Sequence, residues 1–417
     1  FNDKVLVNGT VIIDSNDDSN DGVITFSTSI DGVDGTGDDL TINSGTGTLT
    51  LQAIGETQAL STLNINTAAT STANISLPNI GDAGNDGVDG VTNIGNSNTN
   101  QLTISGTIYK TGGATDYEAK SGNTILLTAA SPTITTGGAD LSFSTGNIVL
   151  STAGTTTFTT GSGSAGGITV DGTIDGTNGE AEALALESGS GAIQLQGTIG
   201  GTNAVTTIAI NSTNGSAGTI EIVGIGDSDT TGASSTATIG NTSTGTLTLD
   251  GTIYKTGGDQ TYVASATGND SGQNIDITGA ATFTTTNDAV AFNTSGVDLA
   301  NNGTTTVNTG TGIGNVTFAG ALESNGGGND DLVITSGSGT VLFSSTVGAG
   351  DAIGDLSINA SSGSGTITFS STIGDAGNAG TSGTTAIGND LTGTINLNSN
   401  LYKFHGGTTT ITSASGE

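Results

Sequence analysis

Short runs of Ile, Val, Leu and Thr recur along the whole chain, separated by Gly, Asn and Asp. In the middle of the chain such runs start at Ile168, Ile193, Ile208, Ile220 and Leu247. β-branched residues fit a pleated strand, whereas Gly and Asn break helices and favour turns. The pattern therefore predicts many strands of about four to six residues joined by tight turns, and no helix.

The spacing of these runs groups the expected strands into coils. The gaps are either long or come as pairs of short gaps, and both amount to about 25 residues, which is typical of one coil of a parallel β-helix. One coil cannot bury its own apolar face, but stacked coils bury Ile, Val and Leu in a continuous core. We therefore predict an all-β fold, a parallel β-helix, with Ile220 among its core residues.

A longer repeat is superimposed on the coils. Two markers recur, the triplet Ile-Gly-Asp at Ile80, Ile225 and Ile373 and the pair Tyr-Lys at Tyr109, Tyr254 and Tyr402. Both markers are spaced 145 and then 148 residues apart, so the chain consists of tandem repeats of roughly 145 residues.

The repeat divides the chain into residues 1–113, which are partial at their start, 114–258 and 259–407, with residues 408–417 beginning a further unit. Because the sequence starts and stops in mid-pattern, we expect it to belong to a longer array. The alternative fold is a string of β-sandwich domains, one per repeat. The lack of a linker between repeats and an aromatic content of only 4% argue against that alternative.

The Tyr-Lys marker supplies the first candidate site, and its residues are Tyr109, Lys110, Tyr254, Lys255, Tyr402 and Lys403. Three of the five lysines occupy it, so their placement is not random. A structural interpretation has each Lys pairing with a nearby acid while the Tyr packs inside a coil. A functional interpretation has the marker as a docking or cross-linking site, for example through a Lys–Asn isopeptide bond.

Charge excludes some classes of partner. The net charge is −33, from 38 acidic residues and five lysines, and nucleic-acid binding needs many Lys or Arg to neutralise phosphates. Anionic membrane surfaces are disfavoured for the same reason. No apolar stretch is long enough to predict a membrane span. The chain has no cysteine and therefore no disulfide framework.

Clusters of acidic residues are candidate calcium ligands, because Ca²⁺ prefers several oxygen ligands at short spacing. The residues are Asp14, Asp17, Asp18, Asp21, Asp31, Asp34, Asp82, Asp86 and Asp89. The segment from Asp14 to Asp18 begins like an EF-hand loop, but Ser19 stands where the turn glycine belongs. The other interpretation of these acids is a solvated face without bound metal.

An enzyme is not expected. His405 is the single histidine, and it lacks the context of a catalytic triad. Paired carboxylates on a β-helix can cleave polysaccharides, but here the acids recur diffusely and no arginine or aromatic platform accompanies them. A polysaccharide-acting enzyme is therefore the least favoured alternative.

Segments such as GTLTLDGTIYKTGG and SGSGAIQLQGTIGG resemble the β-strand repeats of large bacterial surface proteins, namely filamentous-haemagglutinin-like adhesins and autotransporter passengers. The resemblance implies an extracellular location at the cell surface and a structural or adhesive role. It implies a β-helical stalk or filament, with cell-surface glycans or other cells as partners. From the mid-pattern start and stop of the sequence we also expect copies of the chain to stack end to end. The composition is also similar to that of S-layer proteins, which implies a calcium-binding lattice as the alternative.

Overall fold

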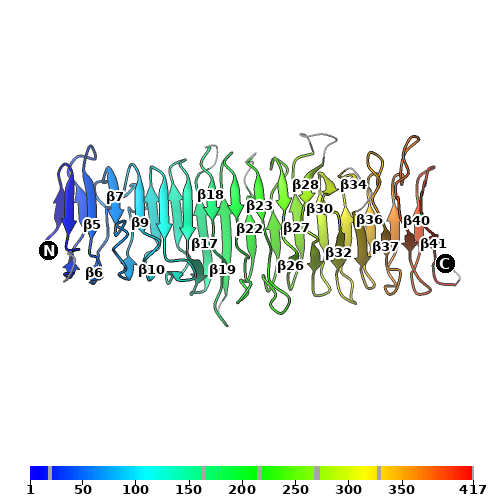
Figure 1. Ribbon diagram of the computed structural model, residues 1–417, viewed down its shortest axis with the longest axis horizontal. Helices are drawn as coiled ribbons and strands as arrows, with labels where there is room; N and C mark the ends of the chain where they lie inside the picture. The colour runs from blue at the N-terminus through cyan, green and yellow to red at the C-terminus, as the bar shows by residue number, and fades with distance from the viewer. Residues whose placement is uncertain are drawn as a thin grey trace. The chain divides into compact units, whose positions relative to one another are not determined.

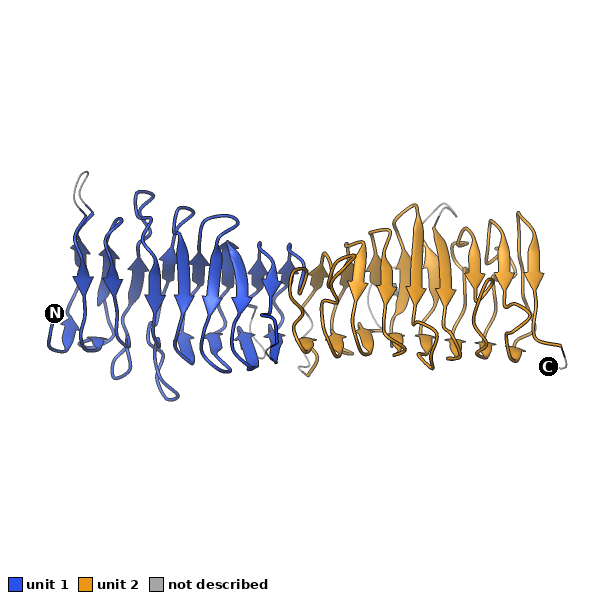
Figure 2. Cartoon of the chain, turned by 90° about the horizontal axis from the view of Figure 1, so that it is seen from below, with its two compact units in different colours: residues 1–199 blue, residues 200–417 orange. Residues whose placement is uncertain are grey.

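The computed structural model describes residues 1–16, 21–161, 165–179, 181–213, 218–266, 273–325 and 330–415. This part of the chain contains β-strands and no helix. The chain divides into two compact units, residues 1–199 and residues 200–417 (Figure 2). This division does not coincide with the repeat boundaries after residues 113 and 258.

Three rows of parallel strands make up unit 1, because each turn of the chain adds one strand to each row (Figure 1). The β1 row contains β1 (Val5–Val7), β4 (Ile30–Gly32), β11 (Ile108–Thr111), β14 (Thr133–Thr136), β17 (Gly154–Thr159) and β20 (Glu182–Glu187). Single bridges at Ile54 and Ile80 connect β4 to β11 within that row. The β2 row contains β2 (Val11–Asp14), β5 (Asp39–Asn43), β7 (Thr62–Ile65), β9 (Thr92–Gly95), β12 (Thr115–Glu118), β15 (Leu141–Thr145), β18 (Ile168–Val170) and β21 (Ile193–Leu195). The β3 row contains β3 (Ile24–Thr25), β6 (Leu49–Thr50), β8 (Ile75–Leu77), β10 (Gln101–Ile104), β13 (Thr124–Leu127), β16 (Asn147–Leu150) and β19 (Ile174–Asp175).

Unit 2 has the same construction. Its β22 row contains β22 (Ile208–Ile210), β24 (Ala237–Ile239), β27 (Gln260–Val263), β30 (Val290–Asn293), β33 (Val316–Phe318), β36 (Val341–Phe343), β38 (Ile367–Phe369) and β40 (Ile395–Leu397). Its β23 row contains β23 (Ile220–Ile222), β25 (Leu247–Leu249), β28 (Gln273–Ile277), β31 (Gly296–Leu299) and β34 (Leu322–Ser324), and continues through single bridges at Val347, Ile373 and Tyr402. Its β26 row contains β26 (Ile253–Lys255), β29 (Thr282–Thr284), β32 (Thr304–Asn308), β35 (Asp331–Thr335), β37 (Leu356–Ile358), β39 (Thr385–Ile387) and β41 (Thr409–Ile411).

Each unit is therefore a parallel β-solenoid with turns of roughly 26 residues, which confirms the predicted parallel β-helix and its coil length of about 25 residues. The β-sandwich alternative is wrong. Strands pair in parallel with the strand one turn later, as β10 does with β13, and not with an antiparallel neighbour in sequence.

Alternation along the strands builds the core. In β23, Ile220 and Ile222 are buried and Glu221 between them is partly exposed, which confirms the prediction for Ile220. Because the rows are in register, identical side chains also stack from turn to turn. In unit 2 the rings of Phe292, Phe318, Phe343 and Phe369 form such a column, with centroids 4.9, 5.1 and 4.9 Å apart. Offset stacking at this spacing is favourable for aromatic rings.

The sequence repeat is not a whole number of turns. In unit 2, five turns from Tyr254 along the β26 row lead to Ile387. The equivalent of Tyr254, which is Tyr402, comes two faces later and lies in the β23 row. Each repeat therefore makes five and two-thirds turns.

Unit 1 shows the same offset between Ile54 and its equivalent Ile199. Five turns from Ile54 along the β1 row lead to Leu186. Ile199 lies two faces later, bridged to Ile174 in the β3 row. Equivalent segments of two repeats therefore lie on different faces of the same unit.

Candidate functional site: the recurring loop stack

The two sequence markers are neighbours in space. Ile80 of the first Ile-Gly-Asp triplet forms a parallel bridge with Tyr109 of the first Tyr-Lys pair, one turn later. The second and third copies repeat this contact, as Ile225 with Tyr254 and Ile373 with Tyr402. The markers therefore belong to one local structure that each repeat contains.

The marker tyrosine closes the turn that precedes its own strand. The Tyr109 hydroxyl donates a hydrogen bond to Leu77 O at 2.7 Å and accepts one from Gly106 N at 2.6 Å. Tyr254 repeats both contacts at 2.9 Å, and Tyr402 accepts a bond from Ser399 N at 2.8 Å. Burial raises the pKa of Tyr109 and Tyr254 well above the usual range, so both phenols stay neutral.

The Ile-Gly-Asp triplet forms a tight loop on the preceding turn. Asp82 Oδ1 accepts hydrogen bonds from Gly84 N and Asn85 N, both at 2.7 Å, and these bonds lower the pKa of Asp82. Gly81 has a φ of +73°, and a Cβ there would lie 2.6 Å from Gly87 N. Only glycine fits this position, which explains the glycine of the triplet.

Asp227 and Asp375 repeat the role of Asp82. The Oδ1 atom of Asp227 accepts hydrogen bonds from the backbone two and three residues later, at 2.8 and 2.5 Å. The Oδ1 atom of Asp375 accepts the same two bonds, both at 2.6 Å. The aspartate of the marker is thus a loop-capping residue in all three copies.

The marker lysine reaches back to this loop. Lys110 Nζ lies 3.2 Å from Asp86 Oδ1, which is the pairing with a nearby acid expected under the structural interpretation. Lys255 Nζ instead donates to Ser228 O at 3.0 Å, and Lys403 Nζ donates to Ala376 O at 3.4 Å. Among the described residues, neither of these two lysines forms an ion pair with a carboxylate.

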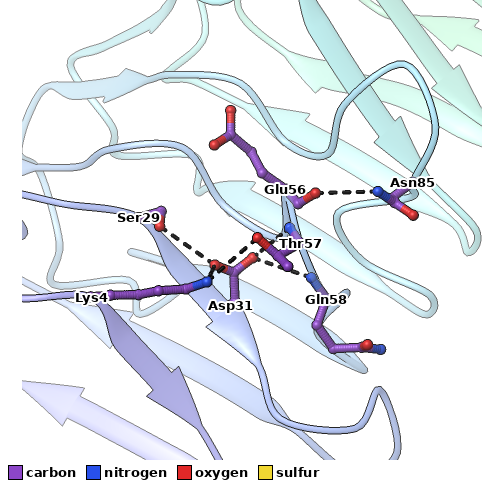
Figure 3. Close-up of polar contacts among 7 residues, drawn as sticks. All are labelled: Lys4, Ser29, Asp31, Glu56, Thr57, Gln58 and Asn85. Atoms are coloured by element: carbon purple, nitrogen blue, oxygen red, sulfur yellow. Dashed lines mark hydrogen bonds and ion pairs between the residues drawn. The ribbon is translucent and has the colours of Figure 1, made fainter.

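A buried carboxylate holds the loop one turn before the triplet (Figure 3). Asp31 is 1% exposed, accepts hydrogen bonds from Thr57 N and Gln58 N at 2.8 and 3.3 Å, and lies 2.9 Å from Lys4 Nζ. Burial alone would raise the pKa of Asp31, but these three partners lower it below its usual value. Asn85 connects the two loops by donating to Glu56 O at 3.3 Å.

The third repeat contains the same arrangement in unit 2. Glu323 takes the place of Asp31 and accepts hydrogen bonds from Gly350 N and Asp351 N at 3.1 and 3.3 Å. Asn378 takes the place of Asn85 and donates to Ala349 O and Gly350 O, both at 3.2 Å. We call this assembly the loop stack: residues 54–60, 80–88 and 109–110 in the first repeat and residues 347–353, 373–381 and 402–403 in the third.

Each of these two loop stacks encloses a groove along one side. The first has a volume of about 290 Å³ and is lined by Gln58, Asn85, Asp86, Asp89 and Lys110, among others. The second has a volume of about 370 Å³ and is lined by Asp351, Asn378, Ser382, Lys403 and His405, among others. His405, for which the sequence gave no catalytic context, lines the second of these grooves.

The acidic residues singled out as calcium ligands mostly hold backbone in place. Asp14 accepts from Asn16 N at 2.8 Å, Asp21 from Thr46 N at 2.5 Å, and Asp34 from Thr36 N at 3.0 Å. Asp17 and Asp18 lie outside the described residues. Where the structure is described, no three His, Cys, Asp or Glu side chains are grouped so that they could hold a metal ion. Calcium binding stays a prediction.

Sequence reasoning missed a row of carboxylates in unit 2. Asp276, Asp298 and Glu323 are direct partners in the adjacent strands β28, β31 and β34. Burial, followed by repulsion from Asp276, Asp330, Glu323 and Asp351, raises the pKa of Asp298 to about 6. No local sequence pattern marks this row, because the pairing of these three residues depends on the register between successive turns.

No protein-family model, curated protein or solved structure matches the chain. Within the described residues no helix long and apolar enough to cross a membrane is found. The function proposed below therefore rests on the geometry of the chain and on its composition.

Proposed function

We propose that the chain is an extracellular structural or adhesive protein of a bacterial surface, which extends by end-to-end stacking of solenoid turns into a fibre or filament. The observation that carries the proposal is the stacking of parallel strands from turn to turn within each unit, as β10 on β13 and β33 on β36. Each turn offers its strands to the next in the same parallel arrangement, so an equivalent turn of another copy can pair in the same way.

The repeating unit supports a structural role, because a solenoid lengthens without a new core each time. The loop stacks support the adhesive part of the proposal, since they present polar grooves that suit cell-surface glycans or other cells as partners.

The alternative is an S-layer-type lattice that binds calcium, and the net charge of −33 favours it because divalent cations bridge carboxylates on neighbouring copies. We do not propose an enzyme. The chain has a single histidine, His405, and no cysteine, and its acidic residues recur diffusely along the sequence, so a polysaccharide-acting site is the least supported alternative.

Electron microscopy and light scattering of the purified chain, with and without calcium, test the proposal. We expect end-to-end growth in both conditions, and lateral bundling of the growing fibres only with calcium, because acidic side surfaces repel one another without it. A two-dimensional lattice in calcium would support the alternative. A strictly monomeric chain at high concentration in both conditions would contradict the fibre proposal.

A further inference from the structure

The lining of the second groove carries less negative charge than the lining of the first. Three positions that line or adjoin the first groove are Asp86, Asp89 and Gly112, and their equivalents 293 residues later are Ala379, Ser382 and His405. The first two differences each remove a negative charge, and the third adds a side chain with a ring N–H donor. The fourth difference is Gln58, whose equivalent is Asp351.

Cation-bearing side chains are scarce in this chain, which has five lysines and one histidine against 38 acids. Two of these six side chains, Lys403 and His405, line the same groove. Among the described residues Lys403 Nζ donates to one backbone acceptor, Ala376 O at 3.4 Å, so its ammonium group keeps donors for a ligand. The first groove lacks this capacity because Asp86 already binds Lys110 at 3.2 Å.

We propose that the groove between Asp351 and Lys403 binds a carboxylated sugar residue, such as a uronic acid. Lys403 and His405 bind its carboxylate, and Asp351 accepts hydrogen bonds from its ring hydroxyls. A simple anion has no hydroxyl groups that could donate hydrogen bonds to Asp351. A neutral sugar has no negative charge that could pair with the ammonium group of Lys403.

The dimensions of the groove fit one sugar ring with its carboxylate. The loops that carry Asp351 and Lys403 belong to turns that are two apart, because Val347, Ile373 and Tyr402 are successive members of one row. Two strand spacings amount to about 9.6 Å. The intervening turn contributes Gly377 and Asn378 to the lining of the groove.

Titration calorimetry of the full chain with digalacturonic acid tests the proposal, with the neutral disaccharide digalactose and with acetate as reference ligands. We expect one site for digalacturonate. Both reference ligands should bind at least about tenfold more weakly, since each offers only half of the recognised groups.

Two variants in the groove should reduce digalacturonate affinity about tenfold or more. Lys403→Gln removes the ammonium group. Ala379→Asp introduces a carboxylate at the position equivalent to Asp86, which forms an ion pair with the marker lysine of the first repeat. Ala379→Asp is also the safer variant for folding, because the first loop stack has aspartate at that position. Lys120→Gln, at an exposed position that lines neither groove, is the matched control with the same charge change and should leave the affinity unaltered.

Absence of digalacturonate binding, equal binding of digalactose, or unaltered affinity in Lys403→Gln would each overturn the proposal. Binding at this groove requires neither filaments nor a cell surface. The assembly experiment above and this titration therefore fail or succeed separately.

Discussion

Two equivalent tyrosines differ in a single hydrogen bond. Tyr117 and Tyr262 are both fully buried, eight residues after the marker tyrosine of their repeats. The Tyr262 hydroxyl donates to Gln260 Oε1 at 3.0 Å, whereas the Tyr117 hydroxyl has no partner among the described residues. The reason is the residue two positions earlier, which is Gln260 in one repeat and the shorter Thr115 in the other.

Removing the two hydroxyls should therefore have opposite effects on the free energy of unfolding. Tyr262→Phe should destabilise the protein by about 1 kcal/mol, because Gln260 loses a buried partner. Tyr117→Phe should be neutral or stabilising, because an unsatisfied buried hydroxyl costs free energy in the folded state. Chemical denaturation of both variants, monitored by circular dichroism, measures the difference. Equal destabilisation by the two substitutions would contradict the assignment.

At the residue scale the sequence predicted which side chains are buried but not what most acids do. Alternation of apolar and polar residues was sufficient to place Ile220 in the core. The roles of Asp31 and Asp82 depend on which backbone N–H groups face them. For Asp31 these belong to a turn that follows it by 26 residues, and no local pattern specifies that neighbour.

The carboxylate row of β28, β31 and β34 makes one element sensitive to pH. Asp298 has a pKa of about 6 in the folded protein, against an ordinary value of 3.8. The folded state therefore binds more protons than the unfolded state between these values, so the free energy of unfolding falls as pH rises through this window. Above about pH 6 to 7, where Asp298 is largely ionised, its carboxylate destabilises unit 2.

Asp298→Asn should raise stability at pH 7.5, by about 1 kcal/mol after allowing for solvent screening of a partly exposed row. The same substitution should have little effect near pH 4, because the wild-type carboxyl is then largely protonated. Asp390→Asn, at an exposed position in the same unit, is the control for loss of one negative charge. Thermal unfolding at the two pH values gives the comparison.

Equal stabilisation by both substitutions at neutral pH would show that net charge, and not the row, is responsible.

The carboxyl groups of Asp31, Asp38 and Asp82 act in the opposite direction, because hydrogen bonds from backbone N–H groups lower the pKa of each. Their contribution is present above about pH 4 and is lost as pH falls below it. The pH profile of the variant must therefore be compared with that of the wild type and not read alone.

At the element scale the strands were predictable and the loop stack was not. Runs of apolar residues and their spacing specified the coils. Ile80 bridges Tyr109 across a solenoid turn of 29 residues, whereas the turn from Leu102 to Ile125 has 23 residues. Because turn lengths vary this much, sequence spacing alone does not show which loops lie next to one another.

The whole chain should tolerate loss of one complete repeat. Deleting residues 110–254 joins Tyr109 to Lys255, so the next strand, β27, follows the marker tyrosine just as β12 does. Each remaining strand then has neighbours equivalent to its original ones, and we expect a cooperative thermal transition and an unchanged β-type circular dichroism spectrum.

Deleting residues 110–246 is the control. It joins Tyr109 directly to Leu247 and removes the corner with Gly112 and Gly113 that separates two strands. We expect this shorter deletion to cause aggregation or a broad transition, although it removes fewer residues. Cooperative folding of both products, or of neither, would show that the repeat period is irrelevant to folding.

The offset of a third of a turn between copies has a consequence for how such a chain can evolve. The segment around Tyr254 lies on one side of unit 2 and the equivalent segment around Tyr402 lies on another, so the same sequence pattern must fit both sides. The three strand rows must therefore accept equivalent segments of different repeats. Unequal recombination can then add or remove copies without compensating mutations elsewhere, and the length of the protein can change within one generation while its cross-section is preserved.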